Sequence, residues 1–471
     1  MPRRAASDEG SAGDLPSVGL WRTLGAAPRG ERQRRVEASP QWDGRRFRNP
    51  EGARMSTGVK AAWDWLAGGS PHRRPAAPVP IRTRAAADFA RPAAGLRVTW
   101  LGHGTSLVEI GGRRLLVDPV WSANAAPGPL FGVRRFHPPP LALAALPPLD
   151  AVLLTHDHYD HLDAETVTAL AARVPRWVCP LGVGARLEGW GVPPEAVTEL
   201  DWWETAALAP TPEASGVAVT ATPARHFSGR FLTDRDATLW CGYALAEASG
   251  DARATTGRPG GSPLREGLSS DETAAPEAPH PSPSRAPLPL TPEASGGHRV
   301  YVGGDGGYSA AFQEVGARLG PFDVALMEVG AYNQAWADIH LGPEQAVRAA
   351  LDARARLLLP VHWATFDLAL HGWTEPGERV RAAAREAGLP LALPRPGESV
   401  TLGGGTSPEA YPTARWWPAL PWETAAEAPV VSANVGAPEA FAPPPGWSPP
   451  EAGASPAPRC GGTPGRATAR G

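Results

Sequence analysis

Cysteine is scarce in this chain of 471 residues, which contains only Cys179, Cys241 and Cys460. Their odd number and wide spacing argue against a disulfide framework, and none has the neighbouring cysteine that a thiolate zinc knuckle requires. Long apolar runs are missing as well, so we expect no membrane-spanning helix, which needs about 18 such residues. The N-terminal MPRRAASDEG lacks the apolar stretch of a secretory signal. We therefore expect a soluble, cytoplasmic protein.

A strong charge of either sign is also absent. The formal net charge is -3, and no basic block extends beyond a few residues. Nucleic-acid-binding surfaces are typically strongly basic, so we expect no nucleic-acid partner. The same absence argues against a nuclease.

Glycine and proline are abundant, with 53 and 55 residues, but they are unevenly distributed. Segments that are rich in them and poor in apolar residues cannot bury enough surface to fold. This composition predicts a disordered leader over 1–45, a disordered insertion over 248–297 and a mostly disordered tail over 405–471. The tail contains Trp416, Trp417, Trp422 and Trp447, which leaves open that part of it packs on the core. The remaining residues of 46–404 are predicted to form one folded domain.

Apolar runs within that domain alternate with helical patterns, which predicts an α/β fold. The first run, 96–122, is interrupted by Gly111 and Gly112, a pair typical of a tight hairpin turn. Further strands are expected at 150–155, 217–224, 237–245, 299–305, 323–330 and 356–363. Helices are expected at 308–319, 343–354 and 376–388, and another begins after Asp163, which has the side chain of an N-cap.

Three of the chain's 12 histidines lie within HDHYDH, directly after the strand at 150–155. A solvated polar loop is the simplest interpretation of such a motif. Alternatively, His156 and His158 point at one metal ion while Asp160 and His161 point at a second, as in sites that hold two ions. One loop cannot complete two coordination shells, so this interpretation requires further donors elsewhere.

Such donors follow three other predicted strands. They are His226, Asp305 and His362, each placed at the end of an apolar run. Three independent coincidences of this kind favour a metal centre over a solvated loop. Imidazole and carboxylate donors suit Zn²⁺, but they also suit Fe or Mn. We expect two divalent ions, with zinc as the first choice.

The motif HxHxDH, followed by a distant His, Asp and His, resembles the metallo-β-lactamase superfamily. This resemblance implies a four-layer αββα fold. A longer series of segments resembles N-acyl-phosphatidylethanolamine-hydrolysing phospholipase D and its bacterial relatives. The segments include WLGHGTSLVEI, LLVDPVWS, LPPLDAVLLTHDHYDHLD, TPARHFSGR, YVGGDGGY, IHLGPEQAV and LPVHWATFDLALHGWTEP. The resemblance covers roughly residues 45–402 without the insertion.

Roles for individual residues follow from that resemblance. It implies one ion held by His156, His158 and His226, a second held by Asp160, His161 and His362, and Asp305 as a bridge between them. Asp160 would also orient the nucleophile, and His340 is a candidate for contact with the substrate. His103 is a candidate hydrogen-bond donor behind the site, although a structural core histidine fits the sequence equally well. Asp157 is expected to orient a ligand or the loop.

The implied activity is hydrolysis of a phosphodiester by a hydroxide held between the two metal ions. A phospholipid or a small phosphodiester is the expected substrate, and a phospholipid substrate suggests peripheral contact with a membrane. Two alternatives remain open. The same ions suit the hydrolysis of a lactone, amide or thioester, and the fold can also serve as a non-catalytic scaffold.

Overall fold

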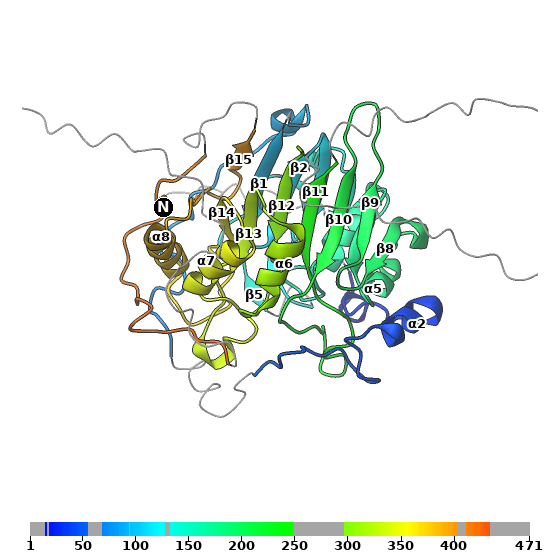
Figure 1. Cartoon of the computed structure of the whole chain (residues 1–471), viewed down its shortest axis with the longest axis horizontal. Helices are drawn as coiled ribbons and strands as arrows, with labels where there is room; N and C mark the ends of the chain where they lie inside the picture. Colours follow the sequence, from blue (N-terminus) through cyan, green and yellow to red (C-terminus); the bar gives the residue numbers. More distant parts are fainter. Residues whose placement is uncertain are drawn as a thin grey trace, which may run out of the picture.

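The computed structural model describes residues 15–16, 18–54, 68–93, 95–127, 132–248, 296–403 and 411–433. Two β-sheets pack face to face, and helices cover their outer surfaces (Figure 1). This is the four-layer αββα arrangement that the sequence predicts, and the metal-binding motif lies at one edge of it.

The first sheet has the strand order β15-β1-β2-β3-β6-β7-β8 within the described residues. Its strands are β1 (Leu96–Gly102), β2 (Thr105–Ile110), β3 (Arg113–Val117), β6 (Ala151–Leu153), β7 (Trp177–Pro180), β8 (Val197–Leu200) and β15 (Ser399–Leu402). Gly111 and Gly112 have φ angles of 58° and 78° and connect β2 to β3, which confirms the predicted hairpin turn. Strand β6 is parallel to both of its neighbours and buried on both faces.

The second sheet has the order β14-β13-β12-β11-β10-β9 within the described residues. Its strands are β9 (Thr205–Leu208), β10 (Val217–Thr222), β11 (Gly242–Glu247), β12 (Arg299–Val302), β13 (Val324–Glu328) and β14 (Leu358–Val361). Strands β12, β13 and β14 are parallel, so their carboxyl ends lie at the same edge of the sheet. A separate two-stranded ribbon joins β4 (Asn124–Ala125) to β5 (Val133–Arg134).

Alternate side chains of the first sheet face two different hydrophobic layers. On β3, Leu115 and Val117 pack into the core between the sheets, whereas Leu116 packs into the core beneath the outer helices. On β6, Val152 belongs to the outer core and Leu153 to the inner one. This period of two is the property of a strand that builds a layered fold.

Helices form the two outer layers. Helices α4 (Ala164–Leu170) and α5 (Gly184–Gly189) cover the first sheet, and α6 (Ala311–Leu319), α7 (Pro343–Asp352) and α8 (Glu375–Ala387) cover the second (Figure 1). Asp163 caps α4 as predicted, because its carboxylate accepts a hydrogen bond from the backbone N–H of Glu165 at 3.2 Å. Short 3-10 helices occur at Ala86–Phe89, Leu143–Ala145, Pro194–Ala196 and Gln334–Trp336.

Strands β11 and β12 pair in antiparallel register on either side of the predicted insertion. Residues 249–295 of that insertion lie outside the described residues. The two cysteines that are described, Cys179 and Cys241, are free and buried.

The predicted leader over 1–45 is wrong for residues 18–45, which form part of the folded structure. They contain α1 (Leu20–Thr23) and α2 (Gly30–Ala38). Val36 is fully buried, and Arg32 pairs with Glu188 at 2.6 Å and with Glu199 at 3.1 Å. The arginines made this segment look solvated, but their acidic partners come from distant parts of the chain. Residues 1–14 lie outside the described residues.

The tail over 405–471 is likewise folded in part. Residues 411–433 pack along α8 and the second sheet, where Trp417 is buried and donates its indole N–H to Glu378 at 3.0 Å. Trp416 lies 5.3 Å from the ring of Trp363. Tryptophan contributes a large apolar surface even in a segment rich in proline and alanine. Residues 404–410 and 434–471 lie outside the described residues.

Candidate metal centre

The HDHYDH motif follows β6 directly, and its loop is held against the end of the buried strand. Here the Nε2 atom of His156 lies 2.9 Å from Nδ1 of His158. His226, which follows β10, places its own Nε2 atom 3.2 Å from the same nitrogen of His158. The first predicted set of three histidines is therefore brought together by two different sheets.

The chemistry of this set fits a bound cation. Three ring nitrogens converge, and each neutral ring can donate only one hydrogen. The Nδ1 atom of His226 is already occupied by the backbone carbonyl of Ile339 at 2.8 Å, so its Nε2 atom faces the other two rings as a lone pair. The Nε2 atom of His158 is buried without a hydrogen-bond partner. A metal ion shared by the rings would be bound by the three converging nitrogens, which are Nε2 of His156, Nδ1 of His158 and Nε2 of His226.

A second set of donors lies beside the first. Here Nε2 of His362 lies 3.1 Å from Nε2 of His161. The Oδ2 atom of Asp160 lies 3.3 Å from His362 Nε2 and 3.6 Å from His161 Nε2. All three side chains reach this place from the carboxyl ends of β6 and β14, which lie in different sheets.

Asp305 stands between the two sets. Its Oδ2 atom lies 3.0 Å from His362 Nε2 and 3.2 Å from His161 Nε2, and it is 4.0 Å from Nε2 of both His156 and His226. Its other oxygen, Oδ1, is buried without a hydrogen-bond partner. A buried carboxylate with an unsatisfied oxygen is costly unless it contacts a cation, so this residue also fits a metal centre.

Asp118 supports the cluster and was not singled out from the sequence. Its Oδ2 atom accepts hydrogen bonds from Nδ1 of His161 at 2.8 Å and from the hydroxyl of Thr155 at 2.7 Å. A carboxylate behind a metal-binding histidine fixes the tautomer and the direction of the ring. The signal was present, because this aspartate follows β3 in LLVDPVWS just as the recognised donors follow their strands.

Glu328, which ends strand β13 (Val324–Glu328), was also not singled out from the sequence. It is fully buried, and its carboxylate accepts from the backbone N–H of Gly306 at 2.6 Å and of Leu341 at 3.1 Å. Burial raises its pKa, and the nearby charge of Asp305 raises it further. The sequence gives little indication of the role of an acid inside an apolar strand. That role depends on which loop packs over the end of the strand, and the sequence does not show this.

His340 lies over the cluster in the loop that follows β13. Its Nδ1 atom donates to Oε2 of Glu328 at 2.7 Å, and its ring centroid is 5.1 Å from that of His226 and 5.6 Å from that of His362. Burial lowers the pKa of His340, but the Glu328 carboxylate outweighs burial, so the pKa is raised. The arrangement leaves Nε2 as the ring nitrogen not engaged by Glu328.

The two predicted supporting residues differ in what they contact. The Nε2 atom of His103 lies 2.8 Å from Oδ2 of Asp160, and burial lowers the His103 pKa to about 3, so a neutral ring donates to this carboxylate. Asp157 points away from the cluster. It forms a buried ion pair with Arg186 at 2.7 Å and accepts from the N–H of Gly229 at 2.8 Å, which fixes the loop.

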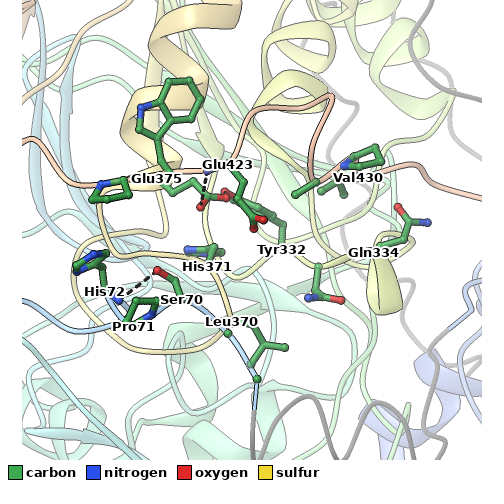
Figure 2. A pocket seen from close by; sticks show the side chains of 17 residues that line it. Ser70, Pro71, His72, Tyr332, Gln334, Leu370, His371, Glu375, Glu423 and Val430 are labelled. Atoms are coloured by element: carbon green, nitrogen blue, oxygen red, sulfur yellow. Dashed lines mark hydrogen bonds between the residues drawn. The ribbon is translucent and has the colours of Figure 1, made fainter.

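One cavity formed by the described residues has none of the predicted metal donors in its lining. It has a volume of about 810 Å³. Figure 2 shows its lining, with Glu423 and Val430 of the tail on one side, Ser70 to His72 on another, and Tyr332 and His371 between them. The ring of His371 is held in this lining by a hydrogen bond, because its Nε2 atom accepts from the N–H of Ala331 at 3.1 Å.

Comparisons with known proteins agree with this geometry. Residues 113–256 and 274–363 match the family model of the beta-lactamase superfamily domain. An uncharacterized protein of Mycobacterium tuberculosis is 41% identical over 379 residues, which cover 78% of this chain and 86% of that protein. N-acyl-phosphatidylethanolamine-hydrolyzing phospholipase D 1 of Caenorhabditis elegans is 30% identical over 312 residues, covering 64% of this chain and 73% of that enzyme.

Among solved structures, a metallo hydrolase from Ignicoccus hospitalis is similar over 65% of this chain and 98% of its own, with 21% identity and a TM-score of 0.43. The family match and the sequence relatives decide the classification: the chain belongs to the metallo-β-lactamase superfamily and is a metal-dependent hydrolase. The predicted superfamily and αββα fold are confirmed.

Proposed function

We propose that this hydrolase holds two divalent metal ions, with zinc expected, and cleaves phosphodiesters of the N-acyl-phosphatidylethanolamine type. The observation that carries the proposal is the division of the donors into two sets that meet at one oxygen, Oδ2 of Asp305. His156, His158 and His226 would hold one ion, and Asp160, His161 and His362 the other, with Asp305 in contact with both. Two such ions supply an activated water and stabilise charge on the phosphoryl oxygens.

The protein's own residues then position the reaction. The His103 ring fixes the carboxylate of Asp160 through its hydrogen bond, so Asp160 can orient a nucleophile on the side of His161 and His362. His340 is held by Glu328 with its Nε2 atom free to contact the substrate or to protonate the leaving oxygen. These roles for Asp160 and His340 are part of the proposal.

The names of two relatives support a phospholipid substrate. The Caenorhabditis elegans relative is named for hydrolysis of N-acyl-phosphatidylethanolamine, and a mitochondrial protein of Saccharomyces cerevisiae, 28% identical over 296 residues, carries the same name. A lactone, amide or thioester substrate is the alternative that the experiment below must distinguish.

An exposed apolar surface supports peripheral membrane contact. No helix of the described residues is long and apolar enough to span a bilayer. Trp21 and Leu232 are 75% and 92% exposed, and Leu20 and Phe231 are also exposed. The two segments are joined by a hydrogen bond from Arg230 Nε to the carbonyl of Thr23 at 2.8 Å. Aromatic and aliphatic side chains on one surface suit insertion at a lipid interface.

The proposed function is tested by measuring the metal content and the activity of the same purified protein. The purified protein is expected to contain about two ions per chain and to hydrolyse bis-p-nitrophenyl phosphate and N-acyl-phosphatidylethanolamine in mixed micelles. Chelation should abolish both activities, and Zn²⁺, Fe²⁺ or Mn²⁺ should restore them. Turnover of a lactone panel without diester turnover would reject the phosphodiesterase assignment.

A catalytic role is separated from a scaffold role by one variant. Asp160→Ala should lose activity and one of the two ions, because this side chain belongs to only one donor set. Unchanged metal content and unchanged activity in the variant would contradict the catalytic interpretation. Membrane contact is measured by sedimentation of the protein with anionic vesicles. The double variant Trp21→Ser with Leu232→Ser should bind these vesicles more weakly and should keep its activity on the soluble diester.

A further inference from the structure

The loop between β13 and α7 carries His340, yet it has little secondary structure of its own. Apart from the 3-10 turn at Gln334–Trp336, residues 330–342 are irregular. Fixing an irregular loop costs about 1–2 kcal/mol of backbone entropy per residue, so contacts from outside the loop must hold it in place. Those contacts come largely from the end of the C-terminal tail.

Four consecutive tail residues, 430–433, bind this loop along its length, and we call them the clasp. Val430 is buried against Tyr332 and Ala337. The backbone N–H of Val431 donates to Oε1 of Gln334 at 2.8 Å, and its carbonyl accepts from Nε2 of the same side chain at 3.1 Å. Figure 2 shows Val430 and Gln334 at the same end of the cavity.

The next clasp residue connects the loop to the following helix. The buried hydroxyl of Ser432 donates to the carbonyl of Ala337 at 2.8 Å and accepts from Nε2 of Gln345 on α7 at 3.0 Å. Both ends of the segment that contains His340 are therefore tied to one side chain of the tail.

Asp338 is the point where the clasp meets the metal centre. Its Oδ1 atom accepts from the N–H of Ala433 at 2.6 Å, and its Oδ2 atom forms a buried ion pair with Arg225 at 3.1 Å. Arg225 also donates to the carbonyl of Ala433 at 3.1 Å, and it directly precedes His226 in the sequence. From the other end of the chain, the N–H of Arg54 donates to Oδ2 of Asp338 at 2.8 Å.

The residues that follow Asp338 are the ones that contact the cluster. The carbonyl of Ile339 accepts from Nδ1 of His226, His340 donates to Glu328, and the N–H of Leu341 donates to the same carboxylate. A displacement of Asp338 would therefore change the direction of one predicted metal ligand and the position of His340 together. Contacts of this kind behind a ligand typically change metal affinity or activity by about 10–100-fold.

We propose that the clasp positions His226 and His340, so that metal binding and turnover depend on a segment that follows the last strand of the fold. The inference rests on the proposed function for the role of His340 and on the predicted ligand set for His226. Residues of the clasp touch neither the ion nor the substrate, and they act through the loop 337–341.

Two substitutions in the full chain test the proposal. Ser432→Ala removes both hydrogen bonds of the hydroxyl with a minimal change in volume, and Asp338→Asn removes the negative charge that binds Arg225. Thr424→Ala is the matched control, because this tail hydroxyl bonds only locally to Glu427 at 2.9 Å. Three quantities are measured for each: Zn²⁺ affinity of the metal-free protein against a chromophoric chelator, hydrogen exchange of the amides in 337–341, and kcat and KM.

The clasp predicts graded and local effects. The Zn²⁺ affinity of the donor set that contains His226 should fall about 10-fold or more in Asp338→Asn and less in Ser432→Ala. Amides of 337–341 should exchange about tenfold faster, while those of β12 and β13 keep their protection. The loss should appear in kcat with KM changed less than about twofold, since the substrate-binding groups are untouched. The Thr424→Ala control should match the wild type in every measurement.

Two results would overturn the inference. If Ser432→Ala and Asp338→Asn both keep the wild-type Zn²⁺ affinity and exchange rates, the clasp does not position the loop. If the variants only lower the melting temperature while kcat at 20 °C stays unchanged, the tail stabilises the fold without acting on the centre. Affinity and exchange are measured without substrate, so an inactive wild-type protein would reject the proposed phosphodiesterase and leave this test valid.

Discussion

The two halves of the sandwich contribute to the metal centre in different ways. The first sheet supplies four predicted donors from one loop of six residues, His156 to His161, with Asp118 behind them. The second sheet supplies single residues at separate strand ends, namely His226, Asp305, Glu328 and His362. Donors within one short loop are brought close together by the chain itself, whereas donors at separate strand ends come together only when the whole sheet has formed. The second half therefore depends more on distant segments such as the tail.

The largest expected loss of activity follows the replacement of one donor from each half. His158→Ala and His226→Ala should each lower the proposed phosphodiesterase activity by about 1000-fold or more, because each would remove a proposed ligand of the same ion, and such an ion supplies several kcal/mol of stabilisation. Metal content by mass spectrometry and initial rates should change equally in the two variants. A large loss in one variant and a small loss in the other would show that the two histidines do not share an ion.

The next effect concerns the stability of the first-half loop. Arg186→Met should lower the free energy of unfolding by about 3–5 kcal/mol, since it leaves the buried carboxylate of Asp157 without its cation. Urea unfolding followed by tryptophan fluorescence measures this loss. Arg34→Met is the control, because its pair with Glu31 is exposed and contributes little. Equal stability of the two variants would contradict the structural role given to Asp157.

A smaller effect is expected behind the second-half donors. Glu328→Gln keeps the shape of the side chain but removes the charge that holds His340, so kcat should fall by about 10–100-fold. The same change removes the main cause of the raised His340 pKa, so that pKa should fall. Glu314→Gln on the exposed face of α6 serves as the control. A variant with full activity and an unchanged pH–rate profile would argue against a role for His340 in the reaction.

The smallest effect lies far from the centre, at the start of β12. The pKa of His298 is raised mainly by its hydrogen bond to Asp323, whose Oδ2 atom is 3.5 Å from Nδ1. A raised pKa in the folded state stabilises the protein below the unfolded pKa of about 6.5, and this stabilisation is lost as pH rises through the folded value. His298→Gln should therefore cost more at pH 5.5 than at pH 9.

Partial exposure of this pair limits the cost to less than about 1 kcal/mol. Urea titrations of the wild type and the variant at the two pH values provide the measurement. A difference that grows with pH, instead of shrinking, would have the wrong sign for this pair. Activity should not change, in contrast to the substitutions at the strand ends.

The sequence predicted the first-half loop in detail because its information is local. Alternating histidines and acids after a short apolar strand indicate a metal site without knowledge of any distant contact. His226, Asp305 and His362 were predicted by the same rule, since a polar residue at a strand end is visible in the sequence. Asp118 and Glu328 also lie at strand ends. Each belongs to a segment whose sequence is typical of a strand followed by a turn, so neither was distinguished from an ordinary acidic residue.

The chain termini show where sequence reasoning failed. The segment 18–45 was predicted to be disordered because it is polar and rich in arginine, glycine, alanine and proline, yet Arg32 and Arg35 pair with acids near α5 and β9. In the tail, the composition was that of a disordered segment, and only the tryptophans suggested packing, namely Trp416, Trp417, Trp422 and Trp447. Composition describes a segment alone, whereas burial depends on the surface that it meets.

By itself the sequence determined the superfamily, the αββα architecture and the identity of the residues that form the cluster, because periodicity and strand-end position are properties of nearby residues. Only the tertiary structure decided how these residues are supported. Carboxylates lie behind His161 and His340, Asp157 points to Arg186, and residues 54 and 433 both contact Asp338. These contacts join residues that are between 12 and 284 positions apart. Such contacts form only after two sheets and their loops have packed, so no local pattern encodes them.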